Sequence, residues 1–400
     1  MNRIFLFALM GWMLVPCLLY SQETKNNNEV YQFTDEIVLP VTPVKNQNRT
    51  GTCWSFSTLS FLESEMLRLK KQETDLSEMY IVYFAYLEKA EKYVRMHGNT
   101  NFGGGGAFHD VTHIIRDYGI VPEEVYRGLN YGEDKHVHGE MDAILKDLVD
   151  AVVKNPNRKL STVWNEPVVG TLKSYLGEIP EKFDYQGKSY SPQSFAREYV
   201  GLNMDDYVEL TSFTHHPFYS RFILEIPDNW SWDQVYNVPL NELEEIIDFS
   251  LKKGYTVAWA ADVSEKGFVT GNKMVAVVPE KKIEEMNEAD RLKWEKLSER
   301  EKEEKIYNFD SPVHEMAITQ ELRQIAFDNY QTTDDHGMLI MGTARDQTGK
   351  IWYKVKNSWG DYNKLNGFFY ASKAYVNYKT TDIMVHKDAI PPYIRKKLNL

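Results

Sequence analysis

Residues 47–59 read QNRTGTCWSFSTL and place Cys53 at the start of an expected helix. Beyond Cys53 the apolar residues recur every three or four positions as far as Leu69, which predicts an amphipathic helix of about 17 residues. The free N–H groups and the dipole at a helix N-terminus favour a thiolate over a thiol. Gln47 lies on the loop that approaches this helix, and its side-chain amide could hold an oxyanion together with the Cys53 backbone N–H. Cys53 is therefore a candidate nucleophile, and Gln47 a candidate oxyanion donor.

A general base and a group to orient it occur far along the chain. His336 opens the stretch HGMLIMG, and Asn357 follows 21 residues later in KNSWG. In a Cys/His/Asn triad the asparagine carbonyl fixes the orientation of the imidazole. Neighbouring antiparallel strands would place His336 and Asn357 side by side, and Trp359 on the same face would shield their hydrogen bond from water.

These motifs resemble the papain superfamily of cysteine peptidases. The motifs that carry the resemblance are Gln47, Cys53-Trp54, His336 and Asn357-Ser358-Trp359-Gly360. In papain-like enzymes the histidine follows the cysteine by about 130–150 residues, whereas 283 residues separate them here. One local departure is Thr52, which stands directly before the cysteine.

The extra length between the cysteine and the histidine resembles the bleomycin hydrolase / aminopeptidase C branch of that superfamily. The likeness extends from about Val38 to Lys387. Further stretches that agree with the branch are SEMYIVYFAYLEKAEKYV, GGGGAFHD, YGIVPEEVY, LNMDDYVEL, MNEADRLKWEKL and TTDDHGMLIMG.

The resemblance implies an α+β, papain-like fold with two subdomains and a large, mostly helical insertion. The sequence pattern agrees, because helical periodicity follows Cys53 while the last third predicts short antiparallel strands at HGMLIMGTARD, IWYKVKNSW, GFFYASKAYV and DIMVHK. Thr256 to Val263 predicts a buried strand, and Glu280 to Lys305 a solvated helical pair. The expected divisions are a signal peptide (1–22), a disordered lead-in (23–37), a helical half with the nucleophile (38–130), an inserted helical subdomain (131–316), a sheet half with His and Asn (317–387) and a C-terminal arm (388–400).

The activity that the resemblance implies is hydrolysis of peptide bonds through a thioester acyl-enzyme, with removal of N-terminal residues from peptide substrates. Cys53 would attack the substrate, His336 would act first as base and then as acid, Asn357 would orient His336, and Gln47 would stabilise the oxyanion. An endopeptidase of the same fold, an acyl transferase to an amine and a non-catalytic peptide-binding protein on this scaffold remain the alternatives.

The same resemblance suggests a set of substrate-binding residues. Gly105 and Gly106 fall where the family lays the substrate backbone, Asp335 precedes the catalytic histidine, and Trp359 follows the asparagine. In the family the chain's own C-terminus lies in the cleft, so the Leu400 carboxylate would pair with the free α-amino group of a substrate. Pro391-Pro392 would stiffen this arm as an extended segment, although the cations at 395–397 would repel an ammonium group unless they point away.

Other classes of function find little support in the sequence. His109 and His113, or His136 and His138, could each form half of a metal site, but neither pair has a third ligand nearby in sequence. No Lys-Ser/Thr follows Gly103–Gly106, so a phosphate loop is not indicated. A net charge of −12 without a basic patch argues against nucleic acid. We expect no metal or cofactor; a homo-oligomer, a hexamer by resemblance, is a possible assembly.

The first residues predict export from the cytoplasm. Arg3 followed by an apolar run has the pattern of a signal peptide that ends near residue 22, so we expect a periplasmic or secreted protein. The rival readings are an uncleaved membrane anchor, since Ile4 to Tyr20 spans 17 residues, and a lipid anchor on Cys17, which Pro16 disfavours. Cleavage would leave Cys53 as the one cysteine, unable to form an internal disulfide.

Overall fold

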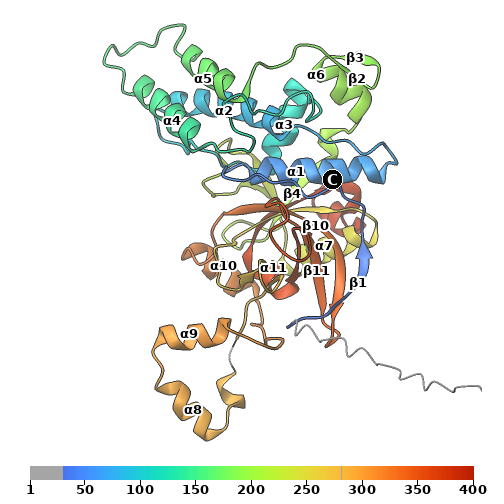
Figure 1. Ribbon diagram of the computed structural model, residues 1–400. Coiled ribbons are helices and arrows are strands. Elements are labelled where there is room, and N and C mark those ends of the chain that lie inside the picture. The colour runs from blue at the N-terminus through green and yellow to red at the C-terminus, as the bar shows by residue number, and fades with distance from the viewer. Residues whose placement is uncertain (1–29, 281) are drawn as a thin grey trace, which may run out of the picture.

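The fold combines a helical half with a sheet half, and helix α1 (Cys53–Arg68) lies between them (Figure 1). The computed structural model describes residues 30–280 and 282–400, so the predicted signal peptide lies outside the described residues. Within the described ranges, no helix combines the length and the apolar composition needed to cross a membrane.

Helix α1 is buried from Cys53 to Met66 because both halves of the molecule pack on it. Several of its hydroxyl side chains donate within the helix: Ser57 Oγ donates to the Cys53 carbonyl at 2.8 Å, and Thr58 Oγ1 to the Trp54 carbonyl at 2.6 Å. A helix whose small hydroxyl side chains bond to nearby carbonyl groups can therefore be buried between two cores.

The helical half gathers above α1 in the view of Figure 1. Its larger helices share one apolar core with α1, and Ser77 caps α2 by accepting from the Tyr80 N–H at 3.1 Å. The elements are α2 (Glu78–Arg95), α3 (Phe108–Tyr118), α4 (Gly139–Val153), α5 (Glu166–Leu176), β2 (Phe183–Tyr185), β3 (Lys188–Tyr190), α6 (Pro192–Ser194), the π-helical turn η1 (Phe195–Val200) and the 3-10 turn η2 (Met204–Asp206).

An eleven-stranded sheet forms the other half among the described residues, in the order β5-β6-β4-β13-β7-β10-β11-β12-β9-β8, with β1 also paired to β10. Its pairs are antiparallel except β4–β6 and β12–β9. The strands are β1 (Phe33–Val38), β4 (Tyr207–Thr211), β5 (Arg221–Ile223), β6 (Gln234–Asn237), β7 (Val257–Ala261), β8 (Phe268–Val269), β9 (Val275–Ala276), β10 (His336–Asp346), β11 (Ile351–Lys356), β12 (Phe368–Ser372) and β13 (Thr380–His386).

The two sides of this sheet face different cores. Ala258, Ala260 and Leu339 pack toward α1, whereas their strand neighbours Trp259 and Met338 pack into a second cluster with the remaining helices. Those helices are α7 (Leu240–Lys252), α10 (Gln320–Asp328), α11 (Lys373–Lys379) and α12 (Pro392–Lys397), with the 3-10 turn η4 (Lys387–Ala389) before α12. The predicted α+β, papain-like class is confirmed.

The segment 131–316 does not form one separate subdomain. It contains α4, α5 and α7 among other helices, but β4, β6 and β7 lie within the central sheet, and the buried strand predicted at 256–263 is β7. The reason is apolar content: every residue of Val257–Ala261 is buried, and such a strand is stable only with neighbours on both edges.

The ends of the described chain also differ from expectation. A disordered lead-in is wrong for residues 33–37, because β1 pairs with β10 and Phe33 stacks on Tyr370 at 3.8 Å. An extended arm over 388–400 is wrong as well: Pro392 begins helix α12, and Ile394 and Leu398 are buried against α7. Helix α11 (Lys373–Lys379) begins within GFFYASKAYV, which was predicted to be a strand.

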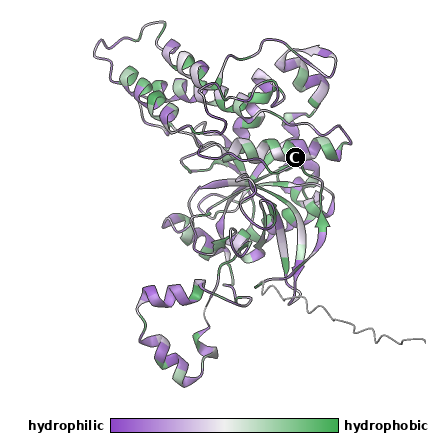
Figure 2. Ribbon diagram, viewed as in Figure 1, coloured by the Kyte–Doolittle hydropathy of each residue, from purple (hydrophilic) through white to green (hydrophobic). Residues whose placement is uncertain are grey.

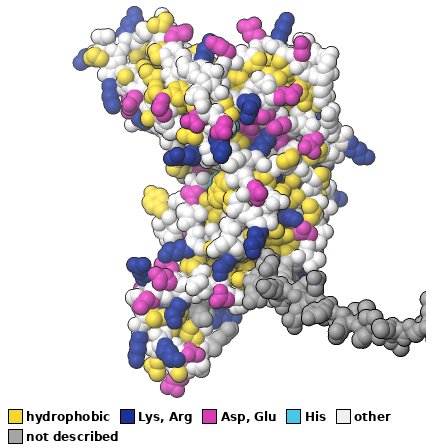
Figure 3. Space-filling view, viewed as in Figure 1, with side chains coloured by type: hydrophobic (Ala, Val, Ile, Leu, Met, Phe, Trp, Pro, Cys, Tyr) yellow, Lys and Arg dark blue, Asp and Glu magenta, His cyan; other side chains and the backbone are white. Residues whose placement is uncertain are grey.

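Helices α8 (Glu288–Glu295) and α9 (Glu299–Tyr307), with the 3-10 turn η3 (Ile283–Glu285) before them, project away from the sheet (Figure 1). Both helices are predominantly hydrophilic, and basic and acidic side chains alternate over their surface (Figures 2 and 3). Pairs such as Arg300–Glu304 at 3.0 Å neutralise charge within the projection. The prediction of a solvated helical pair is confirmed.

Candidate active site

Cys53 is the first residue of α1, and its side chain is buried at 9% exposure. Strand β10 can approach this point because Gly337 has no side chain: a Cβ there would lie 2.5 Å from Ser57 Oγ and 3.3 Å from the Cys53 carbonyl oxygen. The backbone N–H groups of Gly337 and Trp54 lower the pKa of the thiol and so oppose part of the effect of burial. The close contact of α1 with β10 thus joins the nucleophile of one half to the histidine of the other.

His336 and Asn357 meet across neighbouring strands. Strand β10 pairs with β11 in a register that sets Leu339 opposite Lys356, which brings the start of β10 beside the end of β11. His336 Nε2 lies 2.7 Å from Asn357 Oδ1, and the Trp359 ring stacks on the imidazole with centroids 4.7 Å apart. The imidazole is therefore held by a hydrogen bond at its edge and a ring on its face.

The orientation of the Asn357 amide follows from its other partners. Its Oδ1 accepts from the Ser358 N–H at 2.8 Å, and its Nδ2 donates to the Tyr362 hydroxyl at 3.1 Å. With Oδ1 facing the imidazole, His336 Nε2 must carry the hydrogen, since an amide oxygen can only accept. The lone pair of His336 is then on Nδ1, where it can accept a proton.

Gln47 lies beside the same strand end. Its backbone N–H donates to the Ser358 carbonyl at 2.8 Å, and its Oε1 accepts from Ser358 Oγ at 2.6 Å. Its Nε2 donates to the Thr50 carbonyl at 2.9 Å. An amide NH₂ has two hydrogens, so the second is available for an oxyanion at the start of α1.

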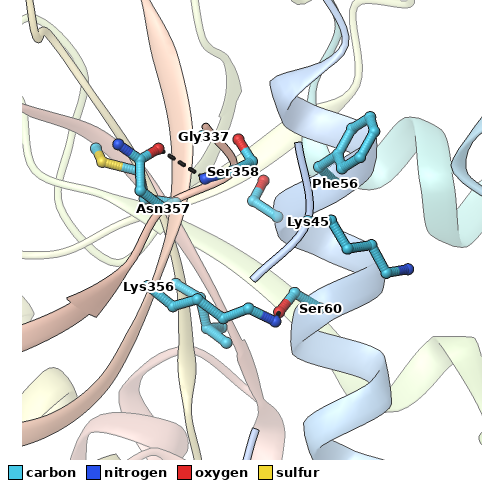
Figure 4. A pocket seen from close by; sticks show the side chains of 10 residues that line it. Lys45, Phe56, Ser60, Gly337, Lys356, Asn357 and Ser358 are labelled. Carbon is cyan, nitrogen blue, oxygen red and sulfur yellow. Dashed lines mark hydrogen bonds between the residues drawn. The ribbon is translucent and has the colours of Figure 1, made fainter. Parts of the chain in front are cut away.

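A small cavity separates α1 from the ends of β10 and β11 behind this site (Figure 4). Figure 4 shows the hydrogen bond from the Ser358 N–H to Asn357 and the Lys356 side chain reaching Ser60. Burial lowers the pKa of Lys356 to about 8, and its Nζ donates to Ser60 Oγ at 2.7 Å and Thr42 Oγ1 at 3.0 Å. These polar contacts fix the strand end that carries Asn357.

Burial controls the protonation of the catalytic pair. It raises the pKa of Cys53 to about 12, with additional contributions from the charges of Asp228 and Asp334, and it lowers the pKa of His336 to about 4. Each shift disfavours an isolated charge in a dry site. Transfer of the thiol proton to the imidazole instead creates both charges together, so thiolate and imidazolium stabilise each other.

The predicted substrate-binding residues are only partly brought together. Gly106, Asp335 and His336 line one pocket with Cys53, which we call the thiol pocket. Gly105 adjoins it, but its exposed side is covered by the carboxylate of Asp228. Asp335 is exposed, and its Oδ2 accepts from the Val263 and Ser264 N–H groups at 3.1 and 3.0 Å.

Leu400 is not brought to the thiol pocket. It packs against the cluster of α7 and α12, on the opposite side of the strands from the core of α1, although the C-terminus overlaps α1 in the view of Figure 1. The cations of the tail are paired there, Arg395 with Asp388 and Lys397 with Glu242, each at 2.6 Å. The burial of Ile394 and Leu398 is the physical reason that the tail folds back.

The histidines considered as metal ligands have other surroundings. His109 Nδ1 lies 2.8 Å from Glu209, and His113 Nε2 lies 3.2 Å from Glu88. His138 is 1% exposed, and neither of its ring nitrogens has a hydrogen-bond partner within the described part of the chain. Two other groups have ligand-like spacing, His215/His216/Glu225 and Glu63/Asp75/Glu78, and neither includes a residue of the thiol pocket.

Three carboxylates of the thiol pocket escaped the sequence analysis. Asp228, Asp334 and Asp382 line it together with Cys53 and His336. Asp334 stands two residues before His336, which is a signal that could have been used. Asp228 and Asp382 reach the pocket from a loop and from strand β13, so only the folded topology places them there.

Comparison with known proteins agrees with this geometry. The Peptidase C1-like family matches residues 15–319 and 295–399 of the chain. Aminopeptidase C of Streptococcus thermophilus is 24% identical, over 93% of this chain and 86% of that protein. Aminopeptidase G of Lactobacillus delbrueckii subsp. lactis is 24% identical, over 87% and 82%. The crystal structure of pepw from Lactobacillus rhamnosis has a TM-score of 0.67 at 20% identity and covers 92% of this chain and 84% of its own.

A thiol at a helix start, facing a histidine and an asparagine on neighbouring strands, defines the papain-like class of cysteine peptidases. Within that class, the chain belongs to the Peptidase C1-like family.

Proposed function

We propose that this protein is a cysteine aminopeptidase, which removes N-terminal residues from peptides through a thioester acyl-enzyme. The observation that carries the proposal is the complete Cys53, His336 and Asn357 constellation, with His336 held 2.7 Å from Asn357. The choice of an aminopeptidase is supported by the curated relatives, which are named aminopeptidases C and G.

The first half of the reaction forms the acyl-enzyme. His336 Nδ1 takes the Cys53 proton, and the sulfur attacks the carbonyl carbon of the substrate's first peptide bond. The oxyanion that forms accepts hydrogen bonds from the free N–H of Gln47 and the Cys53 backbone N–H. His336 then gives its proton to the departing amine as the C–N bond breaks, which leaves the N-terminal residue as a thioester on Cys53.

The second half releases the product. A water molecule gives a proton to His336 and attacks the thioester, the C–S bond breaks, and the proton returns to the sulfur. Asn357 transfers no proton in either half, because it holds the imidazole in place at Nε2. Trp359 covers this hydrogen bond and keeps water away from it.

A pair of otherwise identical decapeptides tests the proposal, one with a free N-terminus and one N-acetylated. Mass spectrometry should show successive loss of N-terminal residues from the free peptide alone, and none with Cys53→Ala. Internal cleavage of both peptides would identify an endopeptidase. Intact peptides that nevertheless bind would identify the non-catalytic scaffold, and amide products with an added amine would identify an acyl transferase.

We also propose that the protein is exported, on the basis of the signal-like residues 1–22. The mature protein should begin near residue 22, which N-terminal sequencing of the cell-envelope and culture fractions tests. Retention of residue 1 in a membrane fraction would favour the uncleaved anchor, and a lipid mass on Cys17 the lipoprotein.

A homo-oligomer is proposed from the family resemblance alone. Light scattering on the purified protein measures the mass directly, and a hexamer would have six times the chain mass of 46.7 kDa before signal removal.

A further inference from the structure

A loop of residues 226–233, here called the bridging loop, spans the two halves of the molecule beside Cys53. It connects strands β5 and β6 of the sheet half. Asn229 closes the base of the loop: this residue is 3% exposed, and its Nδ2 donates to the carbonyls of Leu224 and Asp233, both at 3.0 Å. Its Oδ1 accepts from the Asp233 N–H at 3.1 Å. The loop therefore has a fixed conformation.

The far side of the bridging loop is bound to helices α2 and α3. Trp230 is 5% exposed and donates from Nε1 to Asp110 Oδ2 at 2.7 Å. The Ser231 carbonyl accepts from Lys92 Nζ at 2.8 Å, and Ser231 Oγ lies 2.8 Å from His109 Nε2. The loop is thus anchored to the helical half as well as to the sheet half.

Asp228 is the residue of this loop that enters the substrate cleft. A Cβ on Gly105 would lie 2.0 Å from Asp228 Oδ2, so the carboxylate occupies the space directly above that glycine. A substrate backbone lying along Gly105 and Gly106 cannot continue past this carboxylate. The thiol pocket has about 20 Å³ of free space, while a single water needs roughly 10–15 Å³. It has room for an ammonium group and little more.

Three carboxyl groups line the thiol pocket without a matching cation. Asp228, Asp334 and Asp382 all line it, and none of them forms an ion pair among the described residues. Asp382 is 4% exposed and accepts one long hydrogen bond, from Thr381 at 3.3 Å. Asp334 Oδ2 is buried without a hydrogen-bond partner. Burial raises the pKa of each of these three carboxyl groups, and a bound cation would stabilise their charged form.

The nearest cations are committed to other groups. Lys89 is 2% exposed, and its Nζ donates to the carbonyls of Gly103 and Gly105. Burial alone would lower the pKa of His109, but the charge and the hydrogen bond of Glu209 outweigh burial and raise this pKa to about 10. The protonated His109 is therefore paired with Glu209, at 2.8 Å. An incoming ammonium group would be the partner that the pocket lacks.

We propose that Asp228, supported by Asp334 and the buried Asp382, binds the free α-ammonium group of the substrate and ends this side of the cleft at the substrate's N-terminal residue. The inference rests on the proposed aminopeptidase function and assigns its specificity to an internal loop, in the role that the resemblance gave to Leu400. The α-ammonium is favoured over a basic side chain because Asp228 lies on the backbone-binding glycine rather than at the end of a deep pocket.

Binding of an ammonium group also assists the chemistry. The charges of Asp228 and Asp334 contribute to the raised pKa of the Cys53 thiol, after burial. A substrate cation between them and the sulfur offsets that contribution, so the thiolate forms more readily when a free N-terminus is bound. An N-acetylated substrate lacks this effect and must also displace the Asp228 carboxylate.

The test compares alanyl-7-amido-4-methylcoumarin with its N-acetyl derivative. Asp228→Asn should lower kcat/KM for the free substrate by about 10- to 100-fold, as expected for loss of a hydrogen-bonded charge pair, and mainly through KM. Asp228→Glu should retain most of the preference for the free amine. Asp233→Asn is the matched control in the same loop, because Asp233 is 54% exposed and lies outside the thiol pocket; both substrates should then react as with the wild type.

Several outcomes would overturn the inference. If a folded Asp228→Asn enzyme keeps the wild-type ratio of kcat/KM between the free and the N-acetylated substrate, Asp228 does not bind the α-ammonium group. If the wild-type enzyme cleaves N-acetyl-arginyl coumarin amide in preference to N-acetyl-alanyl coumarin amide, the carboxylates bind a basic side chain instead. If Asp228→Asn does not fold, alaninamide must still protect wild-type Cys53 from iodoacetamide better than N-acetylalaninamide does, and equal protection refutes the inference. A wild-type enzyme inactive on both substrates would instead refute the proposed function itself.

Discussion

Replacement of Asn357 by alanine isolates the role of the residue that orients the base. His336 and Asn357 are 5% and 2% exposed, so Asn357→Ala leaves the buried His336 Nε2–H without its 2.7 Å acceptor. Loss of one partner from a buried hydrogen bond costs about 1–3 kcal/mol. If that cost falls on the productive orientation of the imidazole, kcat decreases roughly 5- to 150-fold. The stacked Trp359 ring still holds the imidazole plane, which is why activity should remain.

The assay is steady-state hydrolysis of alanyl-7-amido-4-methylcoumarin, with thermal unfolding to verify the fold. Asn329→Ala, at an exposed position after α10, is the surface control and should not change kcat. An unchanged kcat in Asn357→Ala would mean that another group orients His336. A loss as complete as that of Cys53→Ala would mean that Asn357 does more than orient the base.

Three further variants test the remaining parts of the account. Gln47→Ala should lower kcat by about 10²–10³-fold with little change in KM, as for other oxyanion donors, and a decrease below twofold in the same assay would exclude the assigned role. Deletion of Asn399-Leu400 should leave the preference for free over N-acetylated substrates unchanged, because Leu400 packs away from the thiol pocket. A reduced preference would mean that the C-terminal tail takes part in substrate binding. His138→Leu concerns stability: burial lowers the pKa of His138 from 6.5 to about 3, so the unfolded state binds a proton below pH 6.5 that the folded state does not. The native protein therefore loses stability as the pH falls from about 6.5 towards 3, and at pH 5 this loss is about 2 kcal/mol. Urea unfolding should show that His138→Leu raises the free energy of unfolding, relative to the wild type, by that amount more at pH 5 than at pH 8. An equal effect of the substitution at both pH values would contradict the lowered pKa of His138.

The catalytic residues were accessible to sequence analysis because they stand in motifs that resemble the papain superfamily, although the contact of α1 with β10 joins residues 283 positions apart. His336 begins β10 and Asn357 directly follows β11, so the antiparallel register of these two strands brings them together. Cys53 begins a helix whose apolar periodicity is regular, and the predicted strand HGMLIMGTARD coincides with β10. Each of these depends on neighbours within one strand pair or one helix.

The proposed binding site for the substrate's α-ammonium group could not be predicted from the sequence in the same way. Asp228 lies in a loop without periodicity, and it reaches Gly105 only because β5 and β6 join the sheet beyond β4 and β13. No local pattern predicts such a non-sequential strand order. The two tryptophans in the loop sequence IPDNWSWD were an available signal that the loop packs against other elements.

The C-terminal tail shows a different kind of failure. Pro391-Pro392 suggested an extended arm, but proline is also favoured at the first position of a helix, where its missing N–H costs nothing. Ile394 and Leu398 stand four residues apart, which is the spacing of one helical face, and both are buried. The burial of these two side chains decided the conformation, and their spacing could have been used to predict it.

The most direct test of the central claim is the mass of the covalent intermediate. Wild-type enzyme is mixed with a free-N-terminus peptide, quenched in acid within milliseconds, digested and analysed by mass spectrometry. The account predicts an adduct on the Cys53 peptide equal in mass to one substrate residue, the N-terminal one, and no adduct in Cys53→Ala. An adduct of two or more residues, or turnover without any adduct on Cys53, would contradict it.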